Sequence, residues 1–581
     1  MKLTNVKRTE SSKLLAMLCL FAIAIFVSQS GCSLAARIIF HNGELQLKPA
    51  PPAPSPPGPH VIIFALDGAA HDLLMQAIRS GKAPNIASLL GKEQAPDLFE
   101  HAYSAPDAVS MMPSSTIADW TAIFTGEPPA RDGIAGDEWF NRERERFFAP
   151  VPVSIDGSGD LSQALDNDLI GKQIRVPTLY ERVRGRSYVS LLSIYRGATI
   201  FSTVEPSAVP DLIAVLFKGE LAGELPFKSL SGDIDLDSVP KLTQAINEHG
   251  VPELQVVYFP GIDSFTHATK HNPLQAQVSY LETVTDKGVG QVLDLYRSKG
   301  LLDSTYVIFI ADHGHTPVVY DHNLGTTGND TPFALLADRG FRVRKPKLNL
   351  APADHDFNAV VAYQGFDAYI YLADRSLCPN PGDRCDWMQP PRFRYDVMPV
   401  VRAFYRDNRI GRPVPRLRHT IDLIFARVPV PPGEPTHPFE IYDGHRLVPI
   451  PRYLARHHRS DLVDLDQRMR WLGEGPEGGN AGDIILLSRA SADIPIQDRY
   501  YFSSPTHRHY TYHGSANTLD SYIPFILAKS SASGDELRRK FQSVTGEPSY
   551  ELEMTPLVLS ILGSSAPQAQ PSPPAIMPKS K

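Results

Sequence analysis

Residues 113–133 read PSSTIADWTAIFTGEPPARDG, and the rest of the chain is best understood by starting from this stretch. A turn brings three hydroxyl residues, 114–116, to the start of a short amphipathic helix that Gly126 ends and Pro128 cannot continue. Hydroxyls at a helix N-terminus lie beside free backbone N–H groups and the positive end of the helix dipole, which together favour an anion. A simple N-cap would look the same, so the neighbouring motifs must decide between the two.

Four apolar runs elsewhere in the chain lie next to residues that commonly bind metals. The runs and their motifs are Val61–Leu66 with Asp67-Gly68, Leu254–Phe259 with Asp263-x-x-x-His267, Tyr306–Ala311 with Asp312-His313-Gly314-His315, and Ile523–Leu527 with Tyr512-His513-Gly514-Ser515. Runs rich in Val and Ile predict strands that are buried on both faces. Functional groups in open α/β sheets gather beyond the carboxyl ends of such strands. The sequence therefore predicts a cluster of Asp and His side chains.

The order and spacing of these motifs resemble the alkaline phosphatase superfamily and, within it, the type I phosphodiesterase/nucleotide pyrophosphatase family. Five motifs between Val61 and Leu527 carry the resemblance: the strand-Asp-Gly opening, a P-[ST]-x-T…TG…P…GI nucleophile block, D-x-x-x-H, strand-DHG and a late H-G-S. The resemblance implies an α/β fold, a three-layer α/β/α sandwich with a mostly parallel sheet. Strands that alternate with helices, such as an interrupted helix over 72–90 and a long one over 273–298, indicate the same class.

The resemblance also implies a site for two divalent metal ions and a threonine nucleophile. The implied ligands are Asp263, His267 and His513 for one ion, and Asp67, Asp312, His313 and Thr116 for the other. Asp and His ligands without Cys suit Zn²⁺, or Mn²⁺ where oxygen ligands dominate. Thr116 takes the family's nucleophile position, three residues after the proline. Coordination would lower its pKa so that it attacks as an alkoxide. The resulting phosphothreonine would then be hydrolysed by a metal-activated water.

One residue near the nucleophile departs from the family pattern. Nucleotide pyrophosphatases have an asparagine three residues after the nucleophile, where this chain has Asp119. An asparagine donates a hydrogen bond to a phosphoryl oxygen, whereas an ionised aspartate repels it. We expect Asp119, a candidate substrate contact, to be protonated, turned away to cap the helix, or bonded to a basic residue. His315 is expected to point elsewhere, and His507 and His509 could line the pocket or lie on a solvated loop.

The N-terminal region is typical of an exported protein. Residues 1–31 combine a basic start with a short apolar run and predict a signal peptide. Cys32 lies in a segment that resembles a bacterial lipoprotein cleavage site, which predicts a membrane-attached lipoprotein facing the periplasm or exterior. Plain secretion and an uncleaved anchor are the alternatives. The proline-rich residues 32–59 predict an extended tether or an unimportant leader. Residues 60–562 are expected to form the catalytic domain, and 563–581 a disordered tail.

A cap or insertion is expected within the catalytic domain, over about residues 317–480. This part is rich in Pro and Arg, contains the strand-like Tyr369–Leu372, and takes the usual place for substrate selection. Asp483–Leu487 is expected to return to the core sheet. Cys378 and Cys385 lie in one short loop and predict a disulfide in an exported protein, with two free thiols as the alternative.

Three functions fit these features. With 581 residues, 42% of them hydrophobic, and a net charge of −7, the chain is a globular protein with no general sign of nucleic-acid binding. The leading hypothesis is a metal-dependent hydrolase of phosphodiester or nucleotide pyrophosphate bonds in small-molecule phosphate esters or nucleotides. A phosphomonoesterase using the same site, and an inactive surface lipoprotein with a binding role, are the alternatives. A sulfatase is disfavoured because no cysteine lies near Thr116. The oligomeric state stays open.

Overall fold

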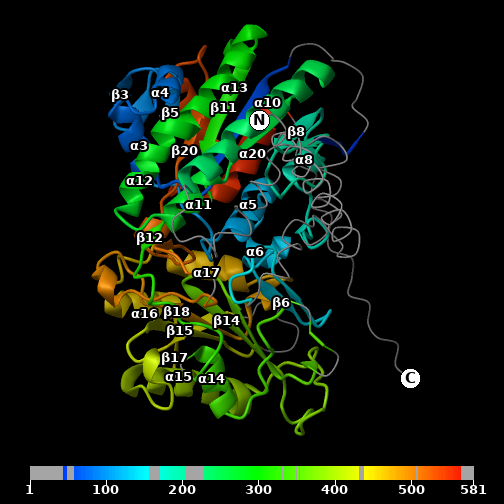
Figure 1. Cartoon of the computed structure of the whole chain (residues 1–581), viewed down its shortest axis with the longest axis vertical. Coiled ribbons are helices and arrows are strands. Elements are labelled where there is room, and N and C mark those ends of the chain that lie inside the picture. The colour runs from blue at the N-terminus through cyan, green and yellow to red at the C-terminus, as the bar shows by residue number, and fades with distance from the viewer. Residues whose placement is uncertain are drawn as a thin grey trace, which may run out of the picture.

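The computed structural model describes most of the predicted catalytic domain and little of the predicted flanking segments. Its described residues are 44–48, 58–155, 170–204, 227–329, 331–348, 350–351, 354–430, 438–505 and 508–563. The predicted signal peptide, Cys32, most of the tether and the tail lie outside these ranges. Among the helices that are described, none has the length and apolar character needed to cross a membrane. Figure 1 shows the described chain as two stacked bodies.

A 10-stranded sheet forms the centre of the upper body in Figure 1. Its strands in spatial order are β1 (Glu44–Gln46), β9 (Ile200–Ser202), β8 (Ser187–Ser190), β10 (Leu254–Phe259), β2 (His60–Leu66), β11 (Thr305–Ile310), β20 (Phe525–Ala528), β5 (Ala102–Ser104), β4 (Leu98–Phe99) and β3 (Glu93–Ala95). The strands from β9 to β11 are parallel, and antiparallel strands flank them at both edges. The predicted α/β fold with a mostly parallel sheet is therefore confirmed, and β2, β10 and β11, all predicted, lie side by side at its centre.

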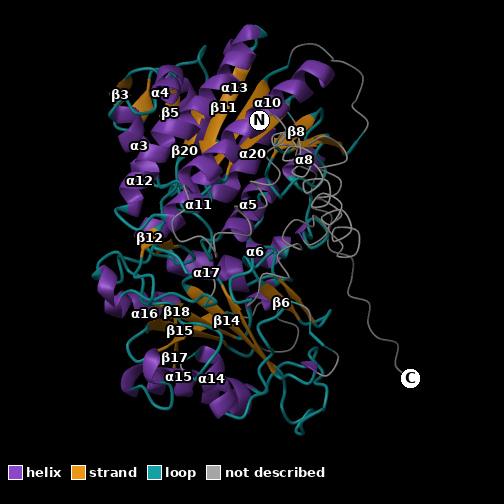
Figure 2. Cartoon of the chain, in the orientation of Figure 1, coloured by secondary structure: helices purple, strands orange, loops and turns teal. Residues whose placement is uncertain are grey.

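Two groups of helices cover this sheet and give the three layers visible in Figure 2. One group is α3 (His71–Arg79), α4 (Pro84–Leu90), α10 (Phe227–His249), α12 (Pro273–Tyr280) and α13 (Asp286–Ser298), and the other is α5 (Thr116–Thr125), α8 (Leu179–Arg182) and α20 (Met554–Leu562). The predicted helix over 72–90 is interrupted as expected, between α3 and α4. The long helix predicted over 273–298 runs through α12, a π-helical segment and α13. Both surfaces of the central strands are thus buried, which explains their continuous apolar runs.

A 6-stranded antiparallel sheet forms the lower body. Its strands in spatial order are β13 (Ala359–Tyr363), β14 (Asp367–Leu372), β18 (Ile484–Ser488), β15 (Ile421–Arg427), β16 (Phe439–Tyr442) and β17 (Leu447–Pro449). The accompanying helices are α14 (Pro332–Asp338), α15 (Met398–Ile410), α16 (Ile450–His457) and α17 (Leu465–Gly473). The strand expected within the insertion is β14. The expectation that 483–487 returns to the core sheet is wrong, because β18 pairs with β14 and β15.

The lower body also contains the predicted disulfide. Cys378 and Cys385 are bonded, with an S–S distance of 2.03 Å and a Cα–Cα distance of 5.0 Å. Both cysteines are buried, in the connection between β14 and α15. The alternative of two free thiols is therefore excluded for this loop.

Candidate active site

The predicted metal ligands meet beyond the carboxyl ends of the central strands. Asp67 follows β2, Asp312 and His313 follow β11, and α11 (Gly261–Ala268) places Asp263 and His267 directly after β10. Because these three strands are adjacent and parallel, their ends coincide at one edge of the sheet. His513 arrives from β19 (Thr511–Tyr512), which pairs with β12 (Thr316–Pro317) just after the β11 motif.

The first group of ligands surrounds His313. Its Nε2 lies 3.4 Å from Asp312 Oδ2, 3.7 Å from Asp67 Oδ1 and 3.2 Å from the hydroxyl of Thr116. Burial and the nearby charge of Asp263 raise the pKa of Asp67, and burial together with Asp67 raises the pKa of Asp312. Burial lowers the pKa of His313 to about 3, so its imidazole is neutral. The structure thus brings together every residue predicted for this half of the site.

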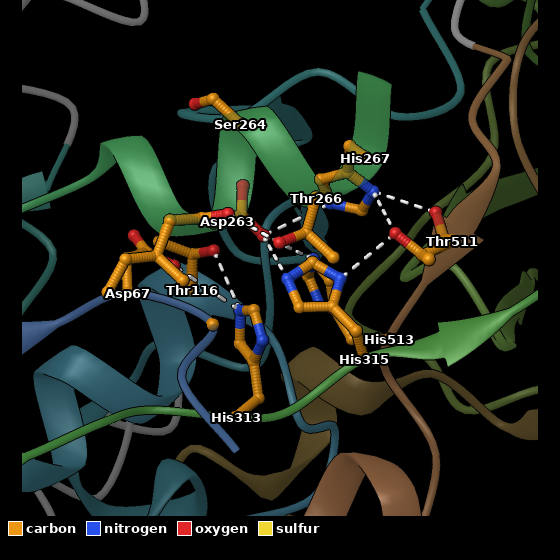
Figure 3. Close-up of polar contacts among 12 residues, drawn as sticks. Asp67, Thr116, Asp263, Ser264, Thr266, His267, His313, His315, Thr511 and His513 are labelled. Carbon is orange, nitrogen blue, oxygen red and sulfur yellow. Dashed lines mark hydrogen bonds and ion pairs between the residues drawn. The ribbon is translucent and has the colours of Figure 1, made fainter. Parts of the chain in front are cut away.

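The second group surrounds Asp263, as Figure 3 shows. Its Oδ1 lies 3.1 Å from His267 Nε2, 3.2 Å from His315 Nε2 and 3.7 Å from His513 Nε2. Burial alone would raise the pKa of Asp263, but the imidazoles of His267 and His315 hold this pKa well below its usual range. Burial and the neighbouring His313 lower the pKa of His513 well below its usual value. The predicted ligands are therefore together, but the expectation that His315 points elsewhere is wrong.

The hydrogen bonds of three imidazoles determine which nitrogen is free to bind a metal. They join His267 Nδ1 to Thr511 O (2.7 Å), His513 Nδ1 to Ser114 O (2.9 Å) and His313 Nδ1 to Gly314 O (3.1 Å). A carbonyl oxygen only accepts, so each Nδ1 donates and Nε2 is the nitrogen left to bind a metal. This is the arrangement by which proteins orient metal-binding histidines. Burial lowers the pKa of His313 and of His513, so their Nε2 atoms carry a lone pair, whereas Asp263 outweighs burial and raises the pKa of His267, so that its Nε2 holds a proton when no cation is bound.

The Nε2 lone pairs of His313 and His513 are directed at carboxylate oxygens and repel them unless a cation lies between. Within the described residues, Asp67 Oδ1, Asp263 Oδ1 and Asp312 Oδ2 are also buried without a hydrogen-bond partner. Three triads keep their candidate ligand atoms within 4.8 Å of one another. They are Asp67, Asp312 and His313; Asp263, His267 and His315; and Asp263, His313 and His513. The residues present therefore fit two divalent cations, and the mixture of imidazole and carboxylate suits zinc.

Helix α5 presents Thr116 as its first residue, with Ser115 at the N-cap. The next backbone N–H, that of Ile117, donates to Asp137 Oδ1 at 3.0 Å. Asp137 is buried, and this burial raises its pKa to about 7. Sequence reasoning missed this carboxyl: it follows the Gly133-Ile134 end of the nucleophile block, but no spacing marked it as part of the site.

Asp119 is fully buried in α5. Burial and the adjacent carboxyl of Glu551 raise its pKa well above the usual value, while Arg468 opposes this shift. Of the three arrangements expected for Asp119, the protonated one agrees best with these surroundings. Its contact with substrate stays a prediction. Among the late histidines, His509 places its ring 4.5 Å from that of His267, whereas His507 lies outside the described residues.

One family model covers the part of the chain that carries all the candidate ligands except His513. Residues 61–362, about half of the chain, match the family model described as type I phosphodiesterase / nucleotide pyrophosphatase. No curated protein matches the sequence. Similar solved structures include two of murine ectonucleotide pyrophosphatase / phosphodiesterase 5, one of them an inactive variant in complex with AMP. Each has 11% sequence identity and a TM-score of 0.48, and the match covers 88% of this chain and 97% of the murine chain. The chain belongs to the type I phosphodiesterase/nucleotide pyrophosphatase family of hydrolases.

Proposed function

We propose that the protein cleaves phosphodiester or nucleotide pyrophosphate bonds in small phosphate esters, with Thr116 as its nucleophile. The observation that carries this proposal is the position of the Thr116 hydroxyl. It lies at the N-terminus of α5 and 3.2 Å from His313 Nε2, against a ligand group that fits a divalent cation. A hydroxyl, an anion-binding helix end and a cation site therefore converge at one point.

Two cations would be held by the two groups described above. Asp67, Asp312, His313 and Thr116 would hold one, and Asp263, His267 and His513 the other. Bound there, the ions would lower the pKa of the Thr116 hydroxyl and stabilise charge on the phosphoryl oxygens. We propose zinc at both sites, with manganese as the alternative, because imidazole ligands suit zinc whereas carboxylate oxygens suit manganese as well.

The chain's own residues carry the bond changes. The Thr116 hydroxyl gives up its proton, and Oγ1 forms a bond to phosphorus while the bond to the leaving group breaks; the leaving oxygen ends with that proton. Water then attacks the same phosphorus and breaks the bond to Thr116, which releases a phosphomonoester and restores the hydroxyl. In both steps, the positive end of the α5 helix dipole stabilises the negative charge on the phosphoryl oxygens.

Asp137 favours diesters over monoesters as substrates. Its carboxyl lies against the first turn of α5, through the bond to the N–H of Ile117. An ionised carboxyl at this place repels a dianionic monoester more strongly than a diester, which has one negative charge. Because burial raises the pKa of Asp137 to about 7, this repulsion acts only above that pH, and there it is limited to the cost of protonating the carboxyl, about 1.4 kcal/mol per pH unit. The phosphomonoesterase alternative is therefore less favoured.

A rate comparison tests the proposal. The purified protein would be assayed on bis-p-nitrophenyl phosphate, p-nitrophenyl phosphate and the p-nitrophenyl ester of thymidine monophosphate, with and without added zinc, beside Thr116→Ala. We expect zinc-dependent hydrolysis that is faster with the diesters and abolished by Thr116→Ala. Faster hydrolysis of the monoester would favour the phosphatase alternative. If the protein hydrolyses none of the three substrates and binds no metal, the remaining hypothesis is an inactive surface lipoprotein with a binding role.

We further propose that the protein is exported and is held at the membrane through a lipidated Cys32, facing the periplasm or exterior. The bonded pair Cys378–Cys385 supports an oxidising compartment. Mass measurement of the mature N-terminus tests this proposal, since cleavage before Cys32 with an added lipid is the expected product.

A further inference from the structure

Arg468 is a buried arginine of the lower body that reaches the turn carrying the nucleophile. It lies on α17 and is fully buried. All of its described hydrogen bonds go to neutral oxygens. They join Nη1 to Ser521 Oγ (2.7 Å) and Val463 O (3.2 Å), and Nη2 to Met111 O (2.5 Å), Ser114 Oγ (2.7 Å) and Ser110 Oγ (3.3 Å). One side chain thus joins three segments that are far apart in the sequence.

Ser114 connects this arginine to the active site. Its hydroxyl accepts from Arg468 and donates to Ser515 O at 2.8 Å. Its carbonyl accepts the Nδ1–H of His513 at 2.9 Å, and Thr116 follows two residues later. The position of Ser114 therefore determines both where the nucleophile lies and how the Nε2 of His513 is directed.

If Arg468 served only to fill space, its buried positive charge would be unfavourable. Burying a guanidinium costs several kcal/mol, and replacing a buried charge by an apolar side chain of similar volume is often neutral or stabilising. Burial lowers the pKa of Arg468, while the carboxyls of Asp119 and Glu551 favour its charged form. An apolar side chain could fill the volume but could not fix the positions of the three segments relative to one another. Fixing them takes several hydrogen-bond donors in a rigid arrangement, which the guanidinium provides.

We propose that Arg468 is a positioning residue, through which the lower body holds Thr116 and His513 in the geometry that hydrolysis requires. This proposal rests on the function proposed above. Arg468 contacts neither the candidate ligands nor Thr116 directly, so its effect passes through Ser114. A displacement of about 1 Å at a reacting group costs on the order of 100-fold in rate.

The test compares Arg468→Met and Arg468→Lys with Arg427→Met in the full-length protein. Arg427 is a matched control, because it is a largely buried arginine of the same body that donates to the carbonyls of Gly473 and Gly482. The measurements are kcat and KM on bis-p-nitrophenyl phosphate, zinc affinity by chelator competition, and the free energy of unfolding in urea.

We expect Arg468→Met to lower kcat at least tenfold with little change in KM, and to weaken the binding of one zinc ion at least tenfold. Arg468→Lys should recover part of both losses, and Arg427→Met should lower stability only. If Arg468→Met does not fold, Ser114→Ala removes the same junction and should give the same losses. The proposal is overturned if these variants keep the wild-type zinc affinity and kcat. Wild-type protein without esterase activity would refute the proposed function instead, and zinc affinity would still decide the role of Arg468.

Discussion

Replacing Gly68 with alanine should disturb the ligand group around Asp263, and the structure sets the size of the effect. Gly68 follows Asp67 with a φ of +69°. A Cβ at this position would lie 2.5 Å from His315 Nε2 and 3.1 Å from the Cα and Cβ of Asp263. Ordinary contacts of a Cβ start at 3.4 Å, so the imidazole must move by about 1 Å or the strand end must shift.

Two penalties follow from this geometry. The left-handed conformation costs a non-glycine residue roughly 1–2 kcal/mol in stability. A shift of about 1 Å in a reacting constellation costs on the order of 100-fold in rate, which corresponds to about 2.7 kcal/mol of transition-state stabilisation. We therefore expect Gly68→Ala to lose roughly 1–2 kcal/mol of unfolding free energy and about 100-fold in kcat, and to bind one zinc ion at least tenfold more weakly.

Gly300→Ala separates the two penalties. Gly300 has a φ of +68° and nothing within 4 Å of its added Cβ, so it shares the backbone cost without the collision. The assays are urea unfolding, chelator competition for zinc, and hydrolysis of bis-p-nitrophenyl phosphate. Both variants should lose similar stability, and only Gly68→Ala should lose zinc affinity and kcat. A Gly68→Ala variant that keeps the zinc affinity and kcat of Gly300→Ala would refute the predicted collision with His315.

Three further predictions concern other parts of the molecule. Because burial raises the pKa of Asp137 to about 7, Asp137→Asn should raise the ratio of monoester to diester hydrolysis about tenfold at pH 8 and hardly at pH 6, measured as kcat/KM on the two p-nitrophenyl substrates; an unchanged ratio at pH 8 would contradict the role given to this carboxyl. Burial raises the pKa of Asp235 to about 8, so the folded protein holds a proton on this carboxyl that the unfolded chain has lost above about pH 4. This group therefore contributes its full stabilisation below about pH 4, and the free energy of unfolding falls by about 1.4 kcal/mol per pH unit between about pH 4 and 8. Asp235→Asn should remove this part of the fall, which urea unfolding at pH 5, 6 and 7 measures. Replacing Cys378 and Cys385 by serine should cost about 2–3 kcal/mol of unfolding free energy and leave kcat nearly unchanged, because the loop they close lies in the lower body.

The centre of the fold and most of the candidate site could be predicted from the sequence because their signals are local. Each of Asp67, Asp263 and Asp312 lies within four residues of the end of an apolar strand. Parallel pairing of neighbouring strands then brings those ends together without any further information.

The missed features depend on contacts between distant segments. His315 turns toward Asp263 because Gly68, far away in the sequence, leaves space for its ring. Asp137 reaches α5 from the turn that precedes β6 (Trp139–Asn141). β18 has the same apolar pattern whichever sheet it joins, so only its pairing with β14 and β15 reveals its place. None of these contacts produces a hydrophobic periodicity or a motif that the sequence alone would reveal.

The central claim is that Thr116 forms a covalent bond to phosphorus during turnover. The stereochemistry of hydrolysis tests it most directly. A chiral phosphorothioate diester would be hydrolysed by the zinc-loaded protein in ¹⁸O-labelled water, and the configuration of the product monoester determined. Two successive displacements, the first by Thr116 and the second by water, predict retention of configuration at phosphorus. Inversion would show a single direct attack by water and would contradict the account.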